Sequence, residues 1–514
     1  MKTYIKNLFL LPALIAALGL ILTGRVTAQT FTTLHSFTAV DPNTGTNSDG
    51  ANPVAGLILS GNTLYGTTEY GGTNGTGLVF KVNTDGTGFT NLYSFTATSG
   101  FFSPNSDGAN PLAGLILSGN TLYGTASLGG SSANGTVFAV NTDGTSFTNL
   151  YSFTATRVSF TNSDGASPAA GLILSGNTLY GTAAGGGRGG VEGGTVFRVN
   201  TDSTDFTNLH SFTYSDGTDP VAGLILSGNT LYGTAQQGGS SDGGTVFAVN
   251  TDGTGTNGTG FTNLYSFTAL SGPNYTNSDG IYPVAGLILS GNTLYGTASQ
   301  GGSWDAGTVF AFNTVNTNGT GFTKLYNFTG LAYNSSFIYT NSAGTHPLAG
   351  LILSGNTLYG TANNGGKNGT GTVFAINTNG SGFTTLYSFT AVNYDASFNS
   401  TNSDGANPQA GLILSGNTLY GTASAGGSSG NGTVFSLSLG SVSAPAPTLT
   451  IFPSGAAVIV TWPTNAAGFT LQSTTNLVST TVWSNVSPAA VVVNTNNAVT
   501  NAISDKQKFY RLSQ

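Results

Sequence analysis

Gly56-Leu-Ile-Leu-Ser-Gly-Asn-Thr-Leu-Tyr-Gly-Thr67 occurs seven times in this chain and decides its fold. The six further copies begin 52 to 64 residues apart, at Gly114, Gly171, Gly223, Gly286, Gly350 and Gly411. A period of this size is typical of repeat proteins, in which each unit buries its apolar faces only against its neighbours. The repeat therefore predicts shape, whereas chemistry has to be argued from the residues that interrupt it.

Each repeat contains four short runs with the composition of β-strands, which we call runs a, b, c and d. Examples are Ala-Gly-Leu-Ile-Leu (55–59), Thr-Leu-Tyr-Gly-Thr (63–67), Gly-Thr-Val-Phe-Ala-Val-Asn (135–141) and Phe-Thr-Asn-Leu-Tyr-Ser-Phe (147–153). These runs are rich in β-branched and aromatic residues and are bounded by Gly, Asn or Asp, as expected for antiparallel strands joined by tight turns. No part of the repeat has helical periodicity.

The order of these runs predicts a closed ring. The first repeat is preceded by an isolated run d, Phe31–Phe37, and the last repeat ends after run c, near Leu437. If the isolated run completes the last sheet, the repeats supply seven sheets of four strands. We therefore expect an all-β fold with a seven-bladed β-propeller over residues 29–440, closed by the N-terminal strand. An open solenoid would need polar capping repeats, and neither end of the array has one.

The N-terminus has the order of a secretory signal peptide. Lys2 and Lys6 precede an apolar run over residues 8–22, and Val26-Thr27-Ala28 offers small residues for cleavage. We expect residues 1–28 to be removed on export. An uncleaved anchor is the alternative, although the apolar run is short and contains Pro12.

The C-terminal part differs from the repeats in composition. Residues 441–447 are rich in Ser, Ala and Pro and predict a linker. Residues 448–514 contain alternating apolar runs, which predict a small β-sandwich of the fibronectin-III or immunoglobulin type. This module is interpreted as a spacer or a sorting domain.

Composition excludes several classes of function. Charged residues make up 6% of the chain, and the formal net charge is −7. Removal of residues 1–28, which hold three cations and no acids, leaves −10. No basic stripe is present, which argues against nucleic acid as a partner. Cysteine is absent, so the chain has no disulfide framework or thiolate metal site. We expect no membrane span in the mature chain and a location outside the cell, at its surface or in the periplasm.

The repeat resembles a known family. Leu122–Thr125, Gly129-Gly130 and Gly135–Phe138 form a pattern similar to the GloVer (Gloeo-Verruco) repeat, and the resemblance covers about residues 31–440. It implies an exported bacterial tandem-repeat protein and brings no catalytic residues. Residues 468–477, with Phe509–Leu512, resemble a fibronectin-III-like terminal domain of exported Verrucomicrobial proteins.

Residues with reactive side chains are few and fit structural roles. His35 and His210 take the Tyr position of run d, and His346 precedes Pro347. Asp-Gly pairs precede run a in six repeats, whereas Ala343 stands at that place in the sixth. One Asp in a loop is a thin ligand set for Ca²⁺, and turn chemistry explains the pair. We expect no catalytic residue, no metal and no cofactor.

Loops on one face of the ring are the expected binding surface. In an up-and-down sheet, the d-to-a and b-to-c connections emerge on the same side, and binding residues often lie on loops of a rigid scaffold. Candidate ligand-binding residues are those that break the repeat there: Glu69, Tyr70, Arg188, Glu192, Trp304, Asp305 and Lys367. Trp304 is the one Trp in the repeats, and an exposed Trp can stack on a sugar. Neutral drift between duplicated copies is the alternative interpretation.

These observations favour an exported, non-catalytic repeat protein that binds a glycan or a surface protein. A polysaccharide lyase or hydrolase on a propeller scaffold is the first alternative, and an adhesion protein without a discrete ligand is the second. Acidic residues are sparse in the loops, which favours binding over acid–base catalysis. The sequence leaves ligand identity and oligomeric state open.

Overall fold

The structure, a computed structural model, forms two compact units. It describes residues 29–98, 103–156, 161–188, 193–254, 260–272, 276–315, 321–333, 338–395, 399–440, 449–464, 470–477, 482–493, 496–502 and 507–513. One unit is Gln29–Leu439, and the other contains the residues from Gly440 onward. The predicted signal peptide and linker lie outside the described residues.

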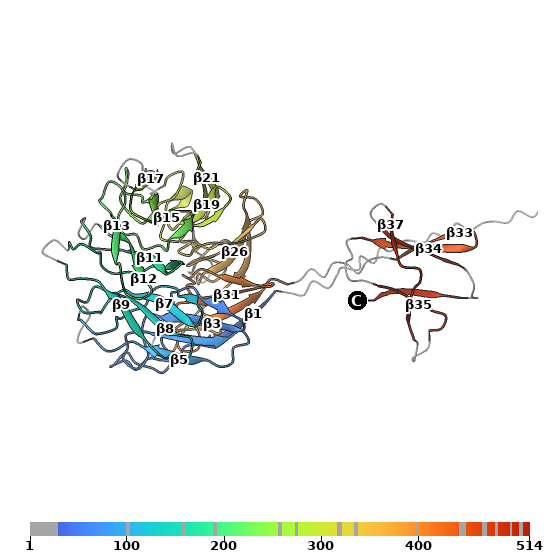
Figure 1. Cartoon of the computed structure of the whole chain (residues 1–514), viewed down its shortest axis with the longest axis horizontal. Helices are drawn as coiled ribbons and strands as arrows, with labels where there is room; N and C mark the ends of the chain where they lie inside the picture. The colour runs from blue at the N-terminus through green and yellow to red at the C-terminus, as the bar shows by residue number, and fades with distance from the viewer. Residues whose placement is uncertain are drawn as a thin grey trace, which may run out of the picture. The chain divides into compact units, whose positions relative to one another are not determined.

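The first unit consists of repeated four-stranded antiparallel sheets, seven of them in the part of the chain that is described. We call each sheet a blade and number the blades along the repeats (Figure 1). Blade 1 contains β2 (Ile58–Ser60), β3 (Thr63–Thr68), β4 (Leu78–Asn83) and β5 (Thr90–Ser94). Blade 2 contains β6 (Ile116–Ser118), β7 (Thr121–Ala126), β8 (Thr136–Asn141) and β9 (Thr148–Ser152). Blade 3 contains β10 (Ile173–Ser175), β11 (Thr178–Ala183), β12 (Thr195–Asn200) and β13 (Thr207–Ser211). Blade 4 contains β14 (Ile225–Ser227), β15 (Thr230–Ala235), β16 (Thr245–Asn250) and β17 (Phe261–Ser266).

The remaining blades follow the same order from strand a to strand d. Blade 5 contains β18 (Ile288–Ser290), β19 (Thr293–Ala298), β20 (Thr308–Asn313) and β21 (Phe322–Asn327). Blade 6 contains β24 (Ile352–Ser354), β25 (Thr357–Ala362), β26 (Thr372–Asn377) and β27 (Thr384–Ser388). Blade 7 contains β30 (Ile413–Ser415), β31 (Thr418–Ala423), β32 (Thr433–Ser438) and β1 (Thr30–Ser36). Two hairpins lie in d-to-a connections: β22 (Ala332–Tyr333) with β23 (Tyr339–Thr340), and β28 (Asn393–Tyr394) with β29 (Ser400–Thr401).

The N-terminal strand completes the last blade, as the sequence predicts. β1 pairs antiparallel with β32, from Thr30 opposite Ser438 to Ser36 opposite Thr433. In Figure 1 the blue N-terminal strand lies against the orange strands of the last repeat. The run d that follows each of the other six repeats completes that repeat's own blade.

Buried threonines connect each blade to the next. In the first repeat, Thr67 Oγ1 donates to the carbonyl oxygen of Ala113 at 3.0 Å, and equivalent bonds start from Thr125, Thr182, Thr234, Thr297 and Thr361. The seventh bond runs from Thr422 Oγ1 to Ala55 O, which joins the last blade to the first. The blades therefore form a closed, propeller-like ring.

The same bonds explain why strand a is shorter than predicted. Run a was expected over residues 55–59, but the ladder with β3 begins only at Ile58, opposite Tyr65. Ala55 gives its carbonyl to Thr422 of the neighbouring blade. A Cβ built on Gly56 would lie 3.3 Å from the carbonyl oxygen of Gly411, so glycine lets the chains approach closely here.

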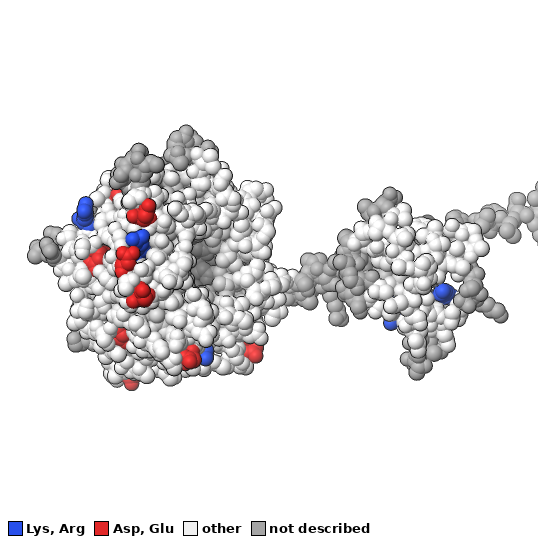
Figure 2. Space-filling model, viewed as in Figure 1, with Lys and Arg blue, Asp and Glu red and all other residues white. Residues whose placement is uncertain are grey.

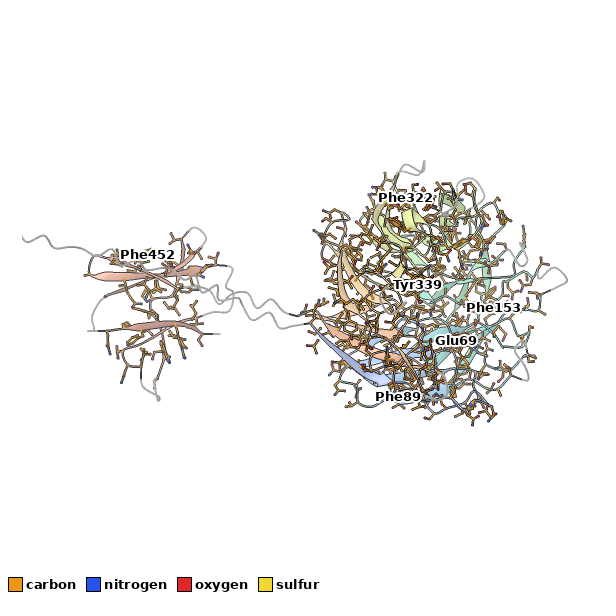
Figure 3. All side chains as sticks on the ribbon, turned by 180° about the vertical axis from the view of Figure 1, so that it is seen from behind. Glu69, Phe89, Phe153, Phe322, Tyr339 and Phe452 are labelled. Atoms are coloured by element: carbon orange, nitrogen blue, oxygen red, sulfur yellow. The ribbon has the colours of Figure 1, made fainter. Side chains whose placement is uncertain are left out.

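Aromatic side chains fill the space between blades. Tyr93 of β5 stacks on Phe147 beside β9, with ring centroids 3.9 Å apart, and Phe95 meets Phe138 edge-on at 5.2 Å. Figure 3 shows Phe89, Phe153 and Phe322 at separate positions around the ring. At the seam, Phe31 of β1 stacks on Tyr387 of blade 6 at 4.1 Å. Each interface thus repeats one packing unit, and β1 supplies the unit for the last interface.

The C-terminal unit has two small antiparallel sheets. One contains β33 (Thr450–Ser454), β34 (Ala457–Pro463), β38 (Asn496–Ala502) and β37 (Val491–Val493). The other contains β36 (Ser484–Asn485), β35 (Thr470–Thr474) and β39 (Phe509–Ser513). Val460, Trp462, Leu471 and Val499 form a core shared by the sheets. The sequence did not predict β38, because its Asn-rich segment has few of the residues that favour strands.

Candidate functional site

The two predicted loop sets lie side by side on one face of the ring unit. In every repeat, one residue of the d-to-a connection forms a β-bridge with a residue of the b-to-c connection. Ala51 pairs in this way with Tyr70, and Thr345 pairs with Asn364. The prediction that d-to-a and b-to-c connections share a face is therefore confirmed. We call this surface the loop face.

A ring of left-handed residues organises the loop face. The residue before the proline of each repeat has positive φ: Asn52, Asn110, Ser167, Asp219, Tyr282, His346 and Asn407. The amide of Asn110 donates to Thr76 O in the preceding blade, and its carbonyl accepts from Ser127 N in its own. Asn52 makes the same link to Asn431 across the seam. This backbone geometry fixes the loops of adjacent blades relative to one another.

Sequence reasoning did not select these seven residues, although a signal was present. Five residue types stand at this position, Asn, Ser, Asp, Tyr and His, and each directly precedes a proline that all seven repeats keep. All of the candidates predicted from the sequence lie in b-to-c connections, whereas these seven residues lie in d-to-a connections.

Buried aspartates anchor the d-to-a connections. Asp107 accepts hydrogen bonds from Tyr93 Oη at 2.6 Å, from Thr96 N at 2.9 Å and from Thr96 Oγ1. His35 and His210 replace the tyrosine in two repeats and contact Asp49 and Asp216 at 2.9 and 3.0 Å. Burial raises the pKa of the Asp49 carboxyl, but hydrogen bonds from His35 and Thr38 outweigh burial and hold the pKa below 3.8. The Asp side chains and their Tyr or His partners therefore stabilise the d-to-a connections, in addition to the turn role that the sequence suggests for Asp-Gly.

His346 has a different environment. It is half-buried, and its Nδ1 lies 2.9 Å from Thr345 Oγ1. Burial lowers the pKa of the imidazole, while the nearby Asp305 opposes that effect. Among the described residues, His, Asp and Glu form no group of three that could hold a metal ion.

Glu69 and Tyr70 lie on the loop face of blade 1. Glu69 is half-buried, and its Oε2 accepts a hydrogen bond from Asn52 Nδ2 at 2.5 Å. Tyr70 is exposed, and burial of its hydroxyl together with the adjacent Glu69 raises its pKa to about 12. Glu69 therefore supports the left-handed residue beside it, whereas Tyr70 presents its ring to solvent.

The cationic candidates occupy one repeat position in different blades. Arg188 and Lys367 both follow a Gly-Gly pair and are exposed. Arg188 borders a hollow of about 740 Å³ that is lined by Thr154, Ala155, Thr161, Asn162, Ser163 and Gly187. Glu192 lies outside the described residues.

Trp304 and Asp305 stand at a short 3₁₀ turn, η2 (Gly302–Trp304), in blade 5. Trp304 is 63% exposed. Asp305 has left-handed backbone, and its Oδ1 accepts from Gly301 N at 2.9 Å. Asp242 caps Gly238 N in the same way in blade 4, so Asp305 has a structural role that is repeated elsewhere.

The candidates do not converge on one catalytic cluster. They come from blades 1, 3, 5 and 6, and within the described ranges no hydrogen bond or ion pair joins candidates of different blades. Instead, the structure gathers exposed aromatic side chains on the loop face: Tyr70, Tyr214, Trp304, Tyr333, Tyr339 and Tyr394. Sequence reasoning missed four of them, because the d-to-a connections vary and offer no constant pattern to break.

Sequence comparison places this architecture in a family. The profile of the Gloeobacter/Verrucomicrobia repeat matches residues 17–157, 100–278, 154–335 and 332–452. The chain belongs to the Gloeobacter/Verrucomicrobia repeat family. The family match ends at residue 452, so the identity of the C-terminal unit is not included in it. A comparison with curated proteins finds no match.

Solved structures give distant likenesses. The chain is similar to quinohemoprotein alcohol dehydrogenase from Comamonas testosteroni, at 10% identity over 84% of this chain and 79% of that one, with a TM-score of 0.46. It is also similar to a chain of a nidogen/laminin complex, at 14% identity over 55% and 81% of the two chains, with a TM-score of 0.33. At these scores neither likeness bears on the function of this Gloeobacter/Verrucomicrobia repeat protein. Its described residues include no helix with the length and apolar character of a membrane span.

Proposed function

We propose that this protein is an exported, non-catalytic binding protein whose loop face recognises a glycan at the cell surface or in the periplasm. In this proposal the ring unit is a seven-bladed β-propeller that acts as a rigid scaffold, and the C-terminal unit is a fibronectin-III-like β-sandwich that acts as a spacer or sorting module. A surface protein is the second class of ligand that the same face could take.

The distribution of exposed aromatic rings carries the proposal. Among described residues of the ring unit, all six exposed aromatic residues lie on the loop face. The a-to-b turns such as Ser60-Gly61-Asn62 and the c-to-d connections such as Asn83–Thr87 lie at the other end of the blades, and their described residues include the exposed Val315 but no exposed aromatic ring. Exposed aromatic rings can stack on the apolar C–H faces of sugars, and rings carried by loops of a rigid scaffold suit a binding surface.

The two acidic candidates that the structure describes, Glu69 and Asp305, lie in different blades, which favours binding over acid–base catalysis. A glycosidase needs two carboxyl groups roughly 5–10 Å apart. In the loop-face candidates, Glu69 is held by Asn52, and Asp305 is held by Gly301 N in another blade.

A glycan array tests the proposal. Residues 29–514 of the wild-type protein should bind a defined set of glycans, and the Trp304→Ala variant should bind them less. Absence of binding to any glycan would contradict the ligand class, and release of reducing ends from a bound polysaccharide would contradict the non-catalytic assignment.

A further inference from the structure

Trp304 is one of three departures from the repeat pattern in blade 5, and each of the other two contacts Trp304 or the turn that carries it. Its position holds Asn74, Ser132, Ser241, Asn368 or Ser429 in other repeats. Gly330 stands where five repeats have alanine, namely Ala39, Ala97, Ala155, Ala269 and Ala391. Asn327 stands where the other six have serine.

Asn327 holds the turn that carries Trp304, as Ser388 and Ser36 hold the equivalent turns of other repeats, and Gly330 lies against the indole. Asn327 Oδ1 accepts from Ser303 N at 2.8 Å, and this bond secures the 3₁₀ turn that bears Trp304. A Cβ built on Gly330 would lie 3.3 Å from Trp304 Cε3 and 3.6 Å from its Cβ. The ring therefore rests against bare backbone on one side, yet 63% of the residue remains exposed.

Two tyrosines extend the aromatic surface. Tyr333 of β22 and Tyr339 of β23 have ring centroids 4.0 Å apart, their hydroxyls are hydrogen-bonded, and they are 61% and 52% exposed. Tyr339 is labelled in Figure 3. Because Tyr333 follows Gly330 by three residues, their Cα atoms lie at most about 11 Å apart. Trp304 and the tyrosine pair thus fall within the span of a short oligosaccharide.

We infer that Trp304, Tyr333 and Tyr339 form a stacking subsite for a neutral glycan, an inference that rests on the proposed function. Stacking uses the apolar faces of the sugar rings, and the tyrosine hydroxyls can exchange hydrogen bonds with sugar hydroxyls. The surface in Figure 2 has few charged side chains, and the formal charge of the chain is −7. None of the three subsite residues is basic, and Asp305, which follows Trp304, accepts a hydrogen bond from Gly301 N, so the subsite offers no cation to an acidic polysaccharide.

Affinity electrophoresis tests this subsite with soluble neutral β-glucan, neutral xylan and polygalacturonate as probes. Wild-type protein should be retarded by a neutral glycan and not by polygalacturonate. Trp304→Ala should lower the affinity at least tenfold, and Tyr333→Ala/Tyr339→Ala should lower it several-fold. Val315→Ala, which removes an exposed apolar side chain from the c-to-d connection of the same blade, should leave the affinity within twofold.

The Gly330→Ala variant tests whether the contact between Gly330 and Trp304 matters for glycan binding. Gly330 has none of the left-handed backbone that would exclude alanine, and alanine is the residue of five other repeats. The melting temperature should therefore stay unchanged, while the added methyl group displaces the indole and weakens retardation at least threefold.

The results of these experiments separate the stacking subsite from the proposed glycan-binding function. Retardation by a neutral glycan that survives Trp304→Ala and Gly330→Ala would overturn the subsite and leave glycan binding intact. Retardation by polygalacturonate alone would overturn the ligand class of the subsite. Retention by an immobilised proline-rich peptide, with no glycan bound, would overturn both the subsite's ligand and the proposed glycan function.

Discussion

At the scale of single residues, one carboxylate in six of the seven d-to-a connections joins two parts of the ring. Asp107 is buried and accepts bonds from the d strand that precedes it through Tyr93 and Thr96, and Thr136 Oγ1 donates to its carbonyl at 3.0 Å. A buried carboxylate costs free energy unless it is fully hydrogen-bonded. The repeated Tyr-Thr-Asp arrangement meets that condition, and it explains why the Asp-Gly pair recurs where turn chemistry alone would also allow Asn.

The sixth repeat offers a gain-of-contact test. Ala343 replaces the Asp, while Asn341 keeps the bond to Gly344 N, and burial alone raises the pKa of Tyr326. Ala343→Asp should restore the contact with Tyr326 and Thr329 and raise the free energy of unfolding by about 1 kcal/mol at pH 7. Thermal denaturation measures the change. The gain should disappear in Ala343→Asp/Tyr326→Phe, and a lower melting temperature for the single variant would contradict the role assigned to the carboxylate.

Acid sensitivity follows from the same carboxyl groups. Asp49 and Asp216 are held below their usual pKa against the effect of burial, chiefly by His35 and His210. Since a carboxyl group with a lower pKa in the folded chain binds fewer protons there, its stabilisation is complete above the unfolded value of about 3.9 and is lost below it. The melting temperature should be flat from pH 7 to 5 and fall below about pH 4. Asp49→Asn should reduce the slope of that fall, and an unchanged slope would exclude Asp49 as a contributor.

At the scale of elements, strand a is defined by the neighbouring blade as much as by its own. Only three residues of β10 pair with β11, and the carbonyl of Ala170 just before it receives Thr125 Oγ1 of blade 2 at 3.0 Å. Each short inner strand is therefore held from two sides. Sequence reasoning found the existence and order of the strands from their composition, but it could not place the start of strand a, because the partner that shortens it belongs to the next repeat.

Replacing one of these threonines tests the link between blades. Thr182 is fully buried, and its Oγ1 donates to Ala222 O at 3.1 Å. Thr182→Val keeps the volume but leaves a buried carbonyl without this donor, so unfolding should become easier by about 1–3 kcal/mol. Thr262→Val, at an exposed position of β17, is the matched control and should change stability by less than about 0.5 kcal/mol. Equal effects in chemical denaturation would contradict a structural role for the inter-blade bond.

At the scale of the whole molecule, the ring closes because the first strand of the chain belongs to the blade of the last repeat. An isolated run d before the first repeat and a missing one after the last were visible in the sequence, and they were sufficient to predict the pairing of β1 with β32. The loop face was predictable in the same way, from strand count alone. The position of Trp304 was not predictable, because it depends on a bond from Ser303 N to Asn327 and on contact with Gly330, more than twenty residues further along the chain.

Ring closure should make the stability of all blades depend on β1. Phe31 stacks on Tyr387 and Phe435, while Leu34 and Phe37 are buried. Burying three such side chains contributes at least about 5 kcal/mol, so deletion of residues 29–40 should lower the melting temperature of the whole ring unit. A synthetic peptide of residues 29–40, added to the truncated protein, should bind β32 and restore much of the loss.

A second peptide shows whether the loss of stability comes from the missing side chains of β1 or only from the shortened chain. The same peptide with Leu34→Ala and Phe37→Ala keeps the backbone donors but lacks the side chains that enter the core. It should therefore restore little stability in the same thermal measurement. If the truncated protein melts at the wild-type temperature, or if both peptides rescue it equally, the first and last repeats do not depend on the side chains of β1, and the ring is held together by its other interfaces alone.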